Sequence, residues 1–306
     1  MTGPSTNITS LYIHLLKNVL TGLAFPEHER SIIPSFRREL HIKPLDLGLR
    51  KTGEDWPLLG LTMVGLDRLD NIQNALRRVD LETVPGDFVE CGVWRGGASI
   101  FATAIINMQR NRQNDFAGGV DDQWASLDYV KVTEKKVKNN FANLNLWQNI
   151  SNVFFAKGYF EESVLKFKNQ IDKIAILRFD GDMYSSTMVI LYHLYEKLSI
   201  GGHIIIDDWL IPACRHAVVK FRQDHDITEE IQFIDDSSIF WVKTRDVIVD
   251  SDDWLNEPEH EGGYANFITF AQLSVYLCYF ILLSYGFKIA LRKDKIKFVY
   301  LSVKQK

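Results

Sequence analysis

The sequence predicts an α/β protein with one mostly parallel sheet and flanking helices. Two apolar runs, residues 174–179 and 202–206, each end in aspartates, and a stretch long enough for a helix separates them. This arrangement is typical of a βαβ unit, in which parallel strands end at the same edge of the sheet. A third observation supports the prediction, because residues 84–108 follow the pattern of a strand, a glycine-rich turn and an apolar helix.

The composition is that of a globular protein with one sizeable core. The chain has 306 residues, of which 46% are hydrophobic and 24% are charged. The net charge of −4 argues against a surface that binds nucleic acid. The three cysteines (Cys91, Cys214 and Cys278) are far apart and lack the spacing of a zinc site, which favours a reducing, cytoplasmic location.

We expect three regions along the chain. Residues 1–80 form an N-terminal helical cap, residues 81–245 the α/β core, and residues 246–306 a nonstandard C-terminal tail. The amphipathic pattern of residues 11–23 and the loop-then-helix pattern of residues 54–79 indicate the cap.

The glycine-rich turn is a candidate binding site for a small ligand. Its acid and glycines follow the spacing Glu-x-Gly-x-x-x-Gly-Gly, with Glu90, Gly92, Gly96 and Gly97. Glycines allow the backbone to approach a ligand closely, and a helix N-terminus favours polar or anionic groups. The spacing differs from that of a dinucleotide fingerprint. An acid just before the first glycine suits a ligand with positive charge, such as S-adenosylmethionine.

The aspartates at the two strand ends are candidate metal ligands. They are Asp180 and Asp182 after the first run and Asp207 and Asp208 after the second. At the carboxyl edge of a parallel sheet these carboxylates converge, and such a cluster is hard to keep ionised without a cation. The alternative is that each aspartate caps a helix or a turn. Two clusters, each with adjacent or alternate acids, favour the metal.

The combination of these motifs resembles the macrocin O-methyltransferase family of sugar O-methyltransferases. The resemblance runs from about residue 11 to residue 244. It rests on residues 53–71, 86–97, 180–187, 207–209 and 234–243.

The resemblance implies a Rossmann-like class I methyltransferase fold. It also implies that S-adenosylmethionine and Mg²⁺ serve as cofactors and that a hydroxyl of a sugar or glycoside is methylated. By the family's motifs, Asp180, Asp207 and Asp208 hold the metal and Asp182 is the general base. Elements that lie over the cofactor in the family add Thr62, Met63 and Gly158 as further candidates for cofactor binding.

One element of the family pattern is not recognisable in the sequence. The family has a second strand that ends in an acid bound to the cofactor ribose, whereas residues 109–123 are polar and have no β-rich run. Three interpretations are open. Asp121 or Asp122 replaces the acid from an irregular loop, the chain lacks a segment, or it is a degenerate relative that acts only as a binding protein. A metal-dependent hydrolase that uses the same carboxylates is a further alternative.

The tail contains an uncharged segment at residues 264–287, which basic residues follow. About 20 apolar residues suffice to cross a bilayer, so a C-terminal membrane anchor is one interpretation. A helix packed on the domain is another, because polar residues dilute the segment. The sequence also leaves homo-oligomer formation open.

Overall fold

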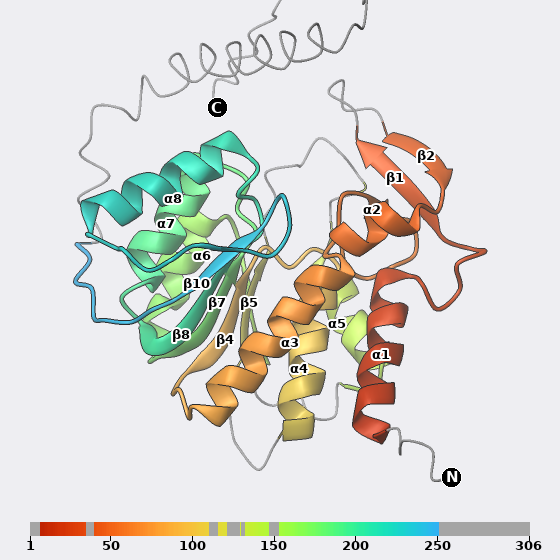
Figure 1. Ribbon diagram of the computed structural model, residues 1–306, viewed down its shortest axis with the longest axis horizontal. Coiled ribbons are helices and arrows are strands. Elements are labelled where there is room, and N and C mark those ends of the chain that lie inside the picture. Colours follow the sequence, from red (N-terminus) through yellow and green to blue (C-terminus); the bar gives the residue numbers. More distant parts are fainter. Residues whose placement is uncertain are drawn as a thin grey trace, which may run out of the picture. The chain divides into compact units, whose positions relative to one another are not determined.

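A seven-stranded sheet forms the centre of the fold (Figure 1). The computed structural model describes residues 7–34, 40–109, 116–120, 129, 132–146 and 153–250, which all belong to one compact unit. The strands are β4 (Asp87–Cys91), β5 (Phe116–Val120), β6 (Val153–Lys157), β7 (Ile174–Phe179), β8 (Leu198–Ile206), β9 (Gln232–Phe233) and β10 (Ile239–Val242). Their order is β6-β5-β4-β7-β8-β10-β9; the pairs among β4 to β8 are parallel, and β10 is antiparallel to both of its neighbours.

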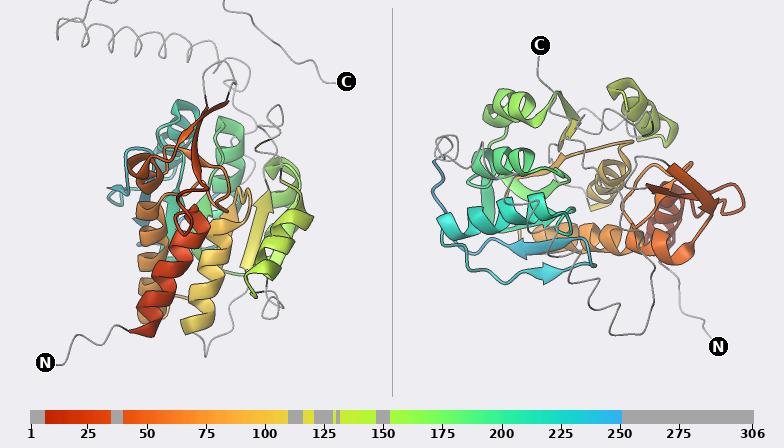
Figure 2. Two further views of the ribbon diagram at one scale, coloured as in Figure 1. Left: turned by 90° about the vertical axis from the view of Figure 1, so that its right-hand side faces the viewer. Right: turned by 90° about the horizontal axis from the view of Figure 1, so that it is seen from above.

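Helices cover both faces of this sheet (Figure 2). The helices of the described residues are α1 (Ile8–Thr21), α2 (Leu47–Thr52), α3 (Leu66–Leu81), α4 (Gly97–Gln109), α5 (Glu134–Asn143), α6 (Phe160–Phe167), the 3-10 helix η2 (Lys168–Gln170), α7 (Tyr184–Leu194) and α8 (Pro212–Asp224). Helices α1, α3 and α4 pack together on one face, and α6, α7 and α8 pack on the other. The fold is therefore the mostly parallel α/β sheet with flanking helices that the sequence predicts.

The larger hydrophobic core lies between the sheet and the layer of α1, α3 and α4. In α3, Leu69, Ile72 and Leu76 follow the spacing of one helix face and are buried against α4. Helix α4 is apolar on almost every side, and its residues from Gly97 to Ile106 are all buried. Full burial of each large apolar side chain contributes about 1.5–3 kcal/mol, so this layer fixes the start of α4 firmly.

The order of the strands reverses at β4, and the carboxyl end of this strand is where a ligand is expected. The chain proceeds from β4 outward through β5 to β6 and then returns to β7 on the other side of β4. Open α/β sheets bind ligands beyond the carboxyl ends of the strands at such a reversal. The glycine turn follows β4, and the two aspartate pairs follow β7 and β8, so all of them lie at this edge.

The expectation that the second strand is missing is wrong. Strand β5 (Phe116–Val120) pairs in parallel with β4 on one side and β6 on the other. Its sequence contains two glycines and one β-branched residue, so neither composition nor alternation indicates a strand. The facing edges of β4 and β6 decide the structure, because their backbone N–H and C=O groups need partners. Asp121 and Asp122 lie outside the described residues.

The N-terminal region contains more than the helices that the sequence predicts. Strands β1 (Arg30–Pro34), β2 (Leu40–Pro44) and β3 (Trp56–Pro57) form a small antiparallel sheet in the order β2-β1-β3. The sequence gives little sign of it, because β3 has only two residues and the side chains of β2 are mostly exposed. Short strands with prolines at their ends carry no clear alternation.

Arg50 ties this region together from a fully buried position. Its guanidinium forms a two-point ion pair with Asp55, in which both N–O distances are 2.8 Å, and it also donates to the backbone carbonyls of Thr21 and Arg30. Glu29 lies 3.8 Å from Arg50 and is also fully buried. Carboxylates and backbone carbonyls therefore surround the positive charge of Arg50, and such partners are needed to stabilise a buried charge.

Among the described residues, no helix is both long enough and apolar enough to cross a membrane. The proposed anchor at residues 264–287 and the rest of the tail after Asp250 lie outside the described residues.

Candidate active site

The turn between β4 and α4 needs glycine at three positions. Gly92 and Gly96 have φ angles of +90° and +87°, which residues with side chains rarely adopt. A Cβ atom on Gly92 would lie 2.4 Å from the backbone oxygen of Asp180, and one on Gly97 would lie 2.5 Å from that of Leu61. The glycines therefore allow β7 and the cap to approach the turn closely.

Thr62 of the cap lies directly against this turn, and Met63 follows it in the chain. The backbone N–H of Gly97 donates to the carbonyl oxygen of Leu61 at 2.9 Å. Thr62 is buried and its hydroxyl accepts the N–H of Val64 at 3.1 Å, whereas Met63 is half-buried. The structure therefore brings Thr62 together with the glycine turn, whereas a contact between Met63 and the cofactor stays a prediction.

Gly158 lies at the same edge of the sheet, after β6. Its φ of +140° is accessible mainly to glycine, and a Cβ atom at this position would have the Cβ of Ser163 as its nearest neighbour, at 3.6 Å. The space that a side chain at position 158 would occupy is therefore open. Because β4, β5 and β6 are parallel neighbours, Gly158 lies two strands away from the glycine turn.

Glu90 is buried beneath the turn, and both of its carboxylate oxygens are paired within the protein. Oε1 lies 2.6 Å from Nη1 of Arg178, and Oε2 accepts the hydroxyl of Ser99. Burial raises the pKa of Glu90, against the opposing effect of Arg178. A direct bond from Glu90 to a cofactor stays a prediction; in the structure Glu90 anchors the first turn of α4 to β4.

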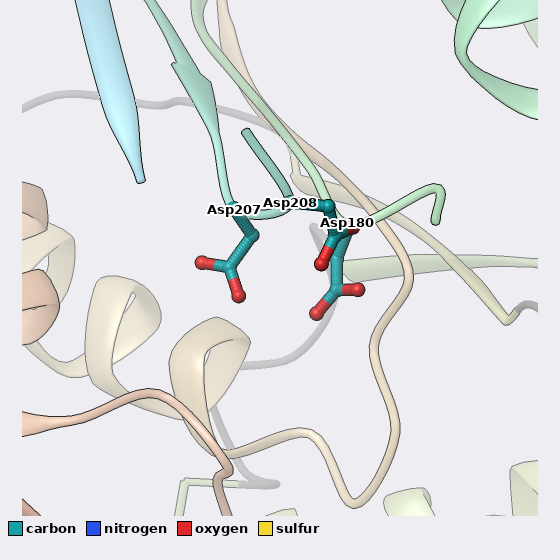
Figure 3. A group of neighbouring side chains, drawn as sticks. All are labelled: Asp180, Asp207 and Asp208. Carbon is teal, nitrogen blue, oxygen red and sulfur yellow. The ribbon is translucent and has the colours of Figure 1, made fainter. Parts of the chain in front are cut away.

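Three of the predicted aspartates form one cluster at the carboxyl ends of β7 and β8 (Figure 3). One carboxylate oxygen from each of Asp180, Asp207 and Asp208 can be chosen so that all three atoms lie within 4.8 Å of one another. Asp207 is buried, whereas Asp180 and Asp208 are half-buried, so the cluster is open on one side. The residues that the sequence predicts as metal ligands are therefore adjacent in space.

Two arginines flank the innermost acid. Oδ1 of Asp207 lies 2.7 Å from Nη2 of Arg178, and Oδ2 lies 2.8 Å from Nη1 of Arg68. Burial opposes ionisation of Asp207, but the two guanidinium groups outweigh it and hold its pKa below the usual range. The two guanidinium groups thus favour the ionised form of Asp207.

The other two acids of the cluster have the opposite shift. Burial, followed by the charges of Asp208 and Asp207, raises the pKa of Asp180 well above its ordinary value. Burial, followed by the charges of Asp182 and Asp207, raises the pKa of Asp208 to about 7. The site thus holds more negative charge than its arginines compensate, and a cation placed among the carboxylates would remove the repulsion.

Asp182 lies beside the cluster but is not part of the three-acid group. Its φ is +46°, and its backbone N–H donates to Oδ2 of Asp208 at 3.0 Å. The side chain is half-buried. Two residues later, the ring of Tyr184 lies 5.3 Å from that of His216, so both rings lie near the carboxyl edge from α7 and α8.

Sequence reasoning assigned no role to the arginines of this site. Arg178 carries the only charge in an otherwise apolar strand, β7, and that exception was the available signal. Arg68 belongs to one of the motifs, but the motif does not indicate its partners. These are Asp207 and Asp235, which lie far along the chain; Oδ2 of Asp235 is 2.6 Å from Nε of Arg68. Such long-range pairs are not encoded in local spacing.

Arg95 was missed as well, and it fastens the glycine turn to the cap. Its Nη1 donates to the carbonyl oxygen of Gly60 at 2.8 Å. Its guanidinium carbon lies 4.2 Å from the ring centre of Trp94 and 5.1 Å from that of Tyr129. Burial lowers the pKa of Arg95. The stacked rings shield the guanidinium and fix the turn.

Comparisons with known proteins show the family of the chain. The family model described as macrocin O-methyltransferase matches residues 9–243. Demethyldecarbamoylnovobiocin O-methyltransferase of Streptomyces niveus is 35% identical over 269 residues, which cover 80% of this chain and 98% of that protein. Mycinamicin III 3''-O-methyltransferase of Micromonospora griseorubida is 34% identical over 263 residues, with coverage of 78% and 98%.

A solved structure extends the agreement to the fold. The O-methyltransferase NovP superimposes with a TM-score of 0.69 at 33% identity, over 78% of this chain and all of that one. With a family model that matches most of the chain and relatives that match over almost their whole length, this chain belongs to the macrocin O-methyltransferase family and is an S-adenosylmethionine-dependent O-methyltransferase.

Proposed function

We propose that the enzyme transfers the methyl group of S-adenosylmethionine to a hydroxyl of a sugar or glycoside, with Mg²⁺ bound at the acid cluster. The observation that carries the proposal is the convergence of Asp180, Asp207 and Asp208 next to the glycine turn. The name of a relative from Streptomyces olivaceus supports the acceptor class, because it describes a 4'-O-methyltransferase of a tetracenomycin that carries a rhamnosyl group.

The donor set of the cluster fits Mg²⁺. All three candidate ligands are carboxylates, and hard divalent cations prefer oxygen ligands. The arginines beside Asp207 do not prevent binding, because a carboxylate offers about four lone-pair positions and the two guanidinium groups use one on each oxygen. When bound there, Mg²⁺ supplies Lewis-acid activation and orientation of the acceptor hydroxyl.

Asp182 is the residue that we propose as general base. It is half-buried, adjacent to the cluster and fixed by the bond from its N–H to Asp208. A carboxylate in this position takes the proton of the hydroxyl while the oxygen attacks the methyl carbon of the sulfonium. The C–O bond forms as the C–S bond breaks, and S-adenosylhomocysteine leaves.

The turn and its surroundings form the proposed cofactor site. Its members are Gly92, Gly96, Gly97, Thr62, Met63 and Gly158, with Glu90 beneath them. The turn leads into the N-terminus of α4, where the helix dipole favours the carboxylate end of the cofactor.

The experiment that tests the proposal measures S-adenosylhomocysteine formation by the full chain. Each reaction contains S-adenosylmethionine, Mg²⁺ and one acceptor from a panel of deoxysugar glycosides, matched to the same aglycones without the sugar. We expect turnover with glycosides only. Turnover on the aglycones alone would contradict the proposed acceptor class.

A further inference from the structure

Arg178 lies where the two halves of the proposed site meet. It belongs to β7, its Cα is opposite Glu90 of β4 and Ile205 of β8, and its side chain is 1% exposed. A charge in the middle of a parallel sheet is costly unless it is paired on several sides. The partners of Arg178 therefore explain why the charge is there.

Those partners come from two different functional regions. Nη1 of Arg178 lies 2.6 Å from Oε1 of Glu90, and Nη2 lies 2.7 Å from Oδ1 of Asp207 and 3.8 Å from Oδ2 of Asp180. One planar guanidinium thus joins a buried acid of the glycine-turn region to two acids of the proposed cation site.

The Glu90 end of this bridge is mechanically linked to the turn. Oε2 of Glu90 accepts the hydroxyl of Ser99, which lies in the first turn of α4. The same turn begins with Gly97, whose N–H bonds to the cap at Leu61. A change in how firmly Arg178 holds Glu90 is therefore transmitted to the start of α4.

We propose that Arg178 is a positioning residue that couples the cation site to the cofactor site, so that Mg²⁺ and cofactor strengthen each other's binding. The inference rests on the proposed function for its two ligands. A divalent cation among Asp180, Asp207 and Asp208 repels the guanidinium and draws the Asp207 carboxylate to itself. The charge of Arg178 is then concentrated on Glu90, and the glycine turn is held more rigidly.

Arg68 provides a matched control. It also contacts Asp207, at 2.8 Å, but its other partner is Asp235. It approaches from α3 and makes none of the bonds that hold Glu90. Loss of the Arg68 contact therefore changes the affinity for the cation without interrupting the bridge to the turn.

Calorimetric titration of the full chain tests this coupling. S-adenosylhomocysteine is titrated with and without Mg²⁺, and Mg²⁺ is titrated with and without S-adenosylhomocysteine, for the wild type, Arg178→Lys, Glu90→Gln and Arg68→Lys. We expect Mg²⁺ to lower the wild-type Kd for S-adenosylhomocysteine about fivefold or more, with the reciprocal effect of the same size. Lysine is a point charge and cannot bind two carboxylates in the planar geometry of a guanidinium. In Arg178→Lys we therefore expect Mg²⁺ to leave the Kd for S-adenosylhomocysteine almost unchanged.

Glu90→Gln removes the other end of the bridge and is expected to give the same loss of coupling. It decides the question if Arg178→Lys does not fold. Arg68→Lys is expected to weaken Mg²⁺ binding but to keep the coupling factor. The inference is overturned if the two ligands bind the wild type independently, or if Glu90→Gln or a folded Arg178→Lys keeps the coupling. Independent binding of both ligands leaves the proposed function standing, whereas an absence of Mg²⁺ binding removes the cation site and the coupling together.

Discussion

At the scale of single residues, Asp182 has the most specific role. It lies beside the acid cluster, with its backbone N–H fixed to Asp208. We expect Asp182→Asn to lower the rate of methyl transfer about 100-fold or more, because the amide cannot accept the hydroxyl proton. Single-turnover kinetics at saturating cofactor measure this directly.

Asp236 offers a control for that substitution. It is an exposed acid in the loop before β10 and belongs to no part of the proposed site. The variant Asp236→Asn is expected to turn over like the wild type. If Asp182→Asn also keeps the wild-type rate, Asp182 is not the base.

His203 gives a prediction about pH and stability. Burial, followed by the charge of Arg78, lowers its pKa from 6.5 to about 4, while Glu82 opposes the shift; its ring stacks on Phe240. Because the folded-state pKa lies below the unfolded one, the unfolded chain binds the proton first. This contribution to stability is complete above pH 6.5 and is lost as the pH falls toward 4, by about 3 kcal/mol at most.

The variant His203→Phe keeps an aromatic ring in the stack on Phe240 and removes the titration. Urea unfolding at about pH 7.5 and about pH 4.5 is expected to show a smaller loss of stability in the variant than in the wild type. The exposed His28 is the control, and His28→Asn should follow the wild type. An identical acid loss in His203→Phe would show that other groups cause it.

Single residues also show which parts of the site could be predicted from the sequence and which could not. The aspartates could be predicted because each follows a strand and because parallel strands end at one edge. Glu90 could be predicted as a member of the glycine motif, but its burial against Arg178 and Ser99 could not. The partners of Arg68 lie 139 and 167 positions away along the chain, so only the tertiary structure brings them together.

At the scale of elements, the start of α4 depends on close approach of the cap. A Cβ on Gly97 would lie 2.5 Å both from the carbonyl oxygen of Leu61 and from the Cβ of Thr62. We expect Gly97→Ala to destabilise the fold by about 1–3 kcal/mol and to weaken binding of S-adenosylhomocysteine, because the cap segment must move. Denaturant unfolding and calorimetry measure the two effects.

Gly48 is a helix glycine without this constraint and serves as the comparison. It is exposed in α2, and the one atom near a Cβ there is a side-chain oxygen of Asp46 at 3.2 Å. Gly48→Ala should leave cofactor binding unchanged. If Gly97→Ala binds as tightly as Gly48→Ala, the contact with the cap is not part of the cofactor site.

Strand β5 shows why an element can escape prediction. The surrounding strands were recognisable from runs of β-branched residues, such as those of β7 and β8, whereas β5 contains two adjacent glycines. Its conformation is imposed by β4 and β6, which hydrogen-bond to it on both sides. Local composition is a weak guide where two neighbouring strands supply the pairing.

At the scale of the whole molecule, the cap depends on buried charge rather than on apolar packing alone. Arg50 and Asp55 are both fully buried and paired through two N–O contacts. We expect Arg50→Met to destabilise the protein by about 3–5 kcal/mol, because it leaves Asp55 and Glu29 without their guanidinium. Equilibrium unfolding in urea is the measurement.

An exposed pair makes the matching comparison. Arg78 and Glu82 form an i,i+4 pair at the C-terminal end of α3, with both side chains largely in solvent. Arg78→Met should change stability by about 1 kcal/mol or less. Equal losses in the two variants would mean that the Arg50 cluster does not organise the cap.

We propose that this methyltransferase works through a cation held by Asp180, Asp207 and Asp208. The most direct measurement is methyl transfer to a glycoside acceptor after treatment with EDTA, followed by addition of Mg²⁺. We predict that EDTA abolishes S-adenosylhomocysteine formation and that Mg²⁺ restores it, but not in Asp208→Asn. Full turnover of the metal-free wild type would contradict the claim.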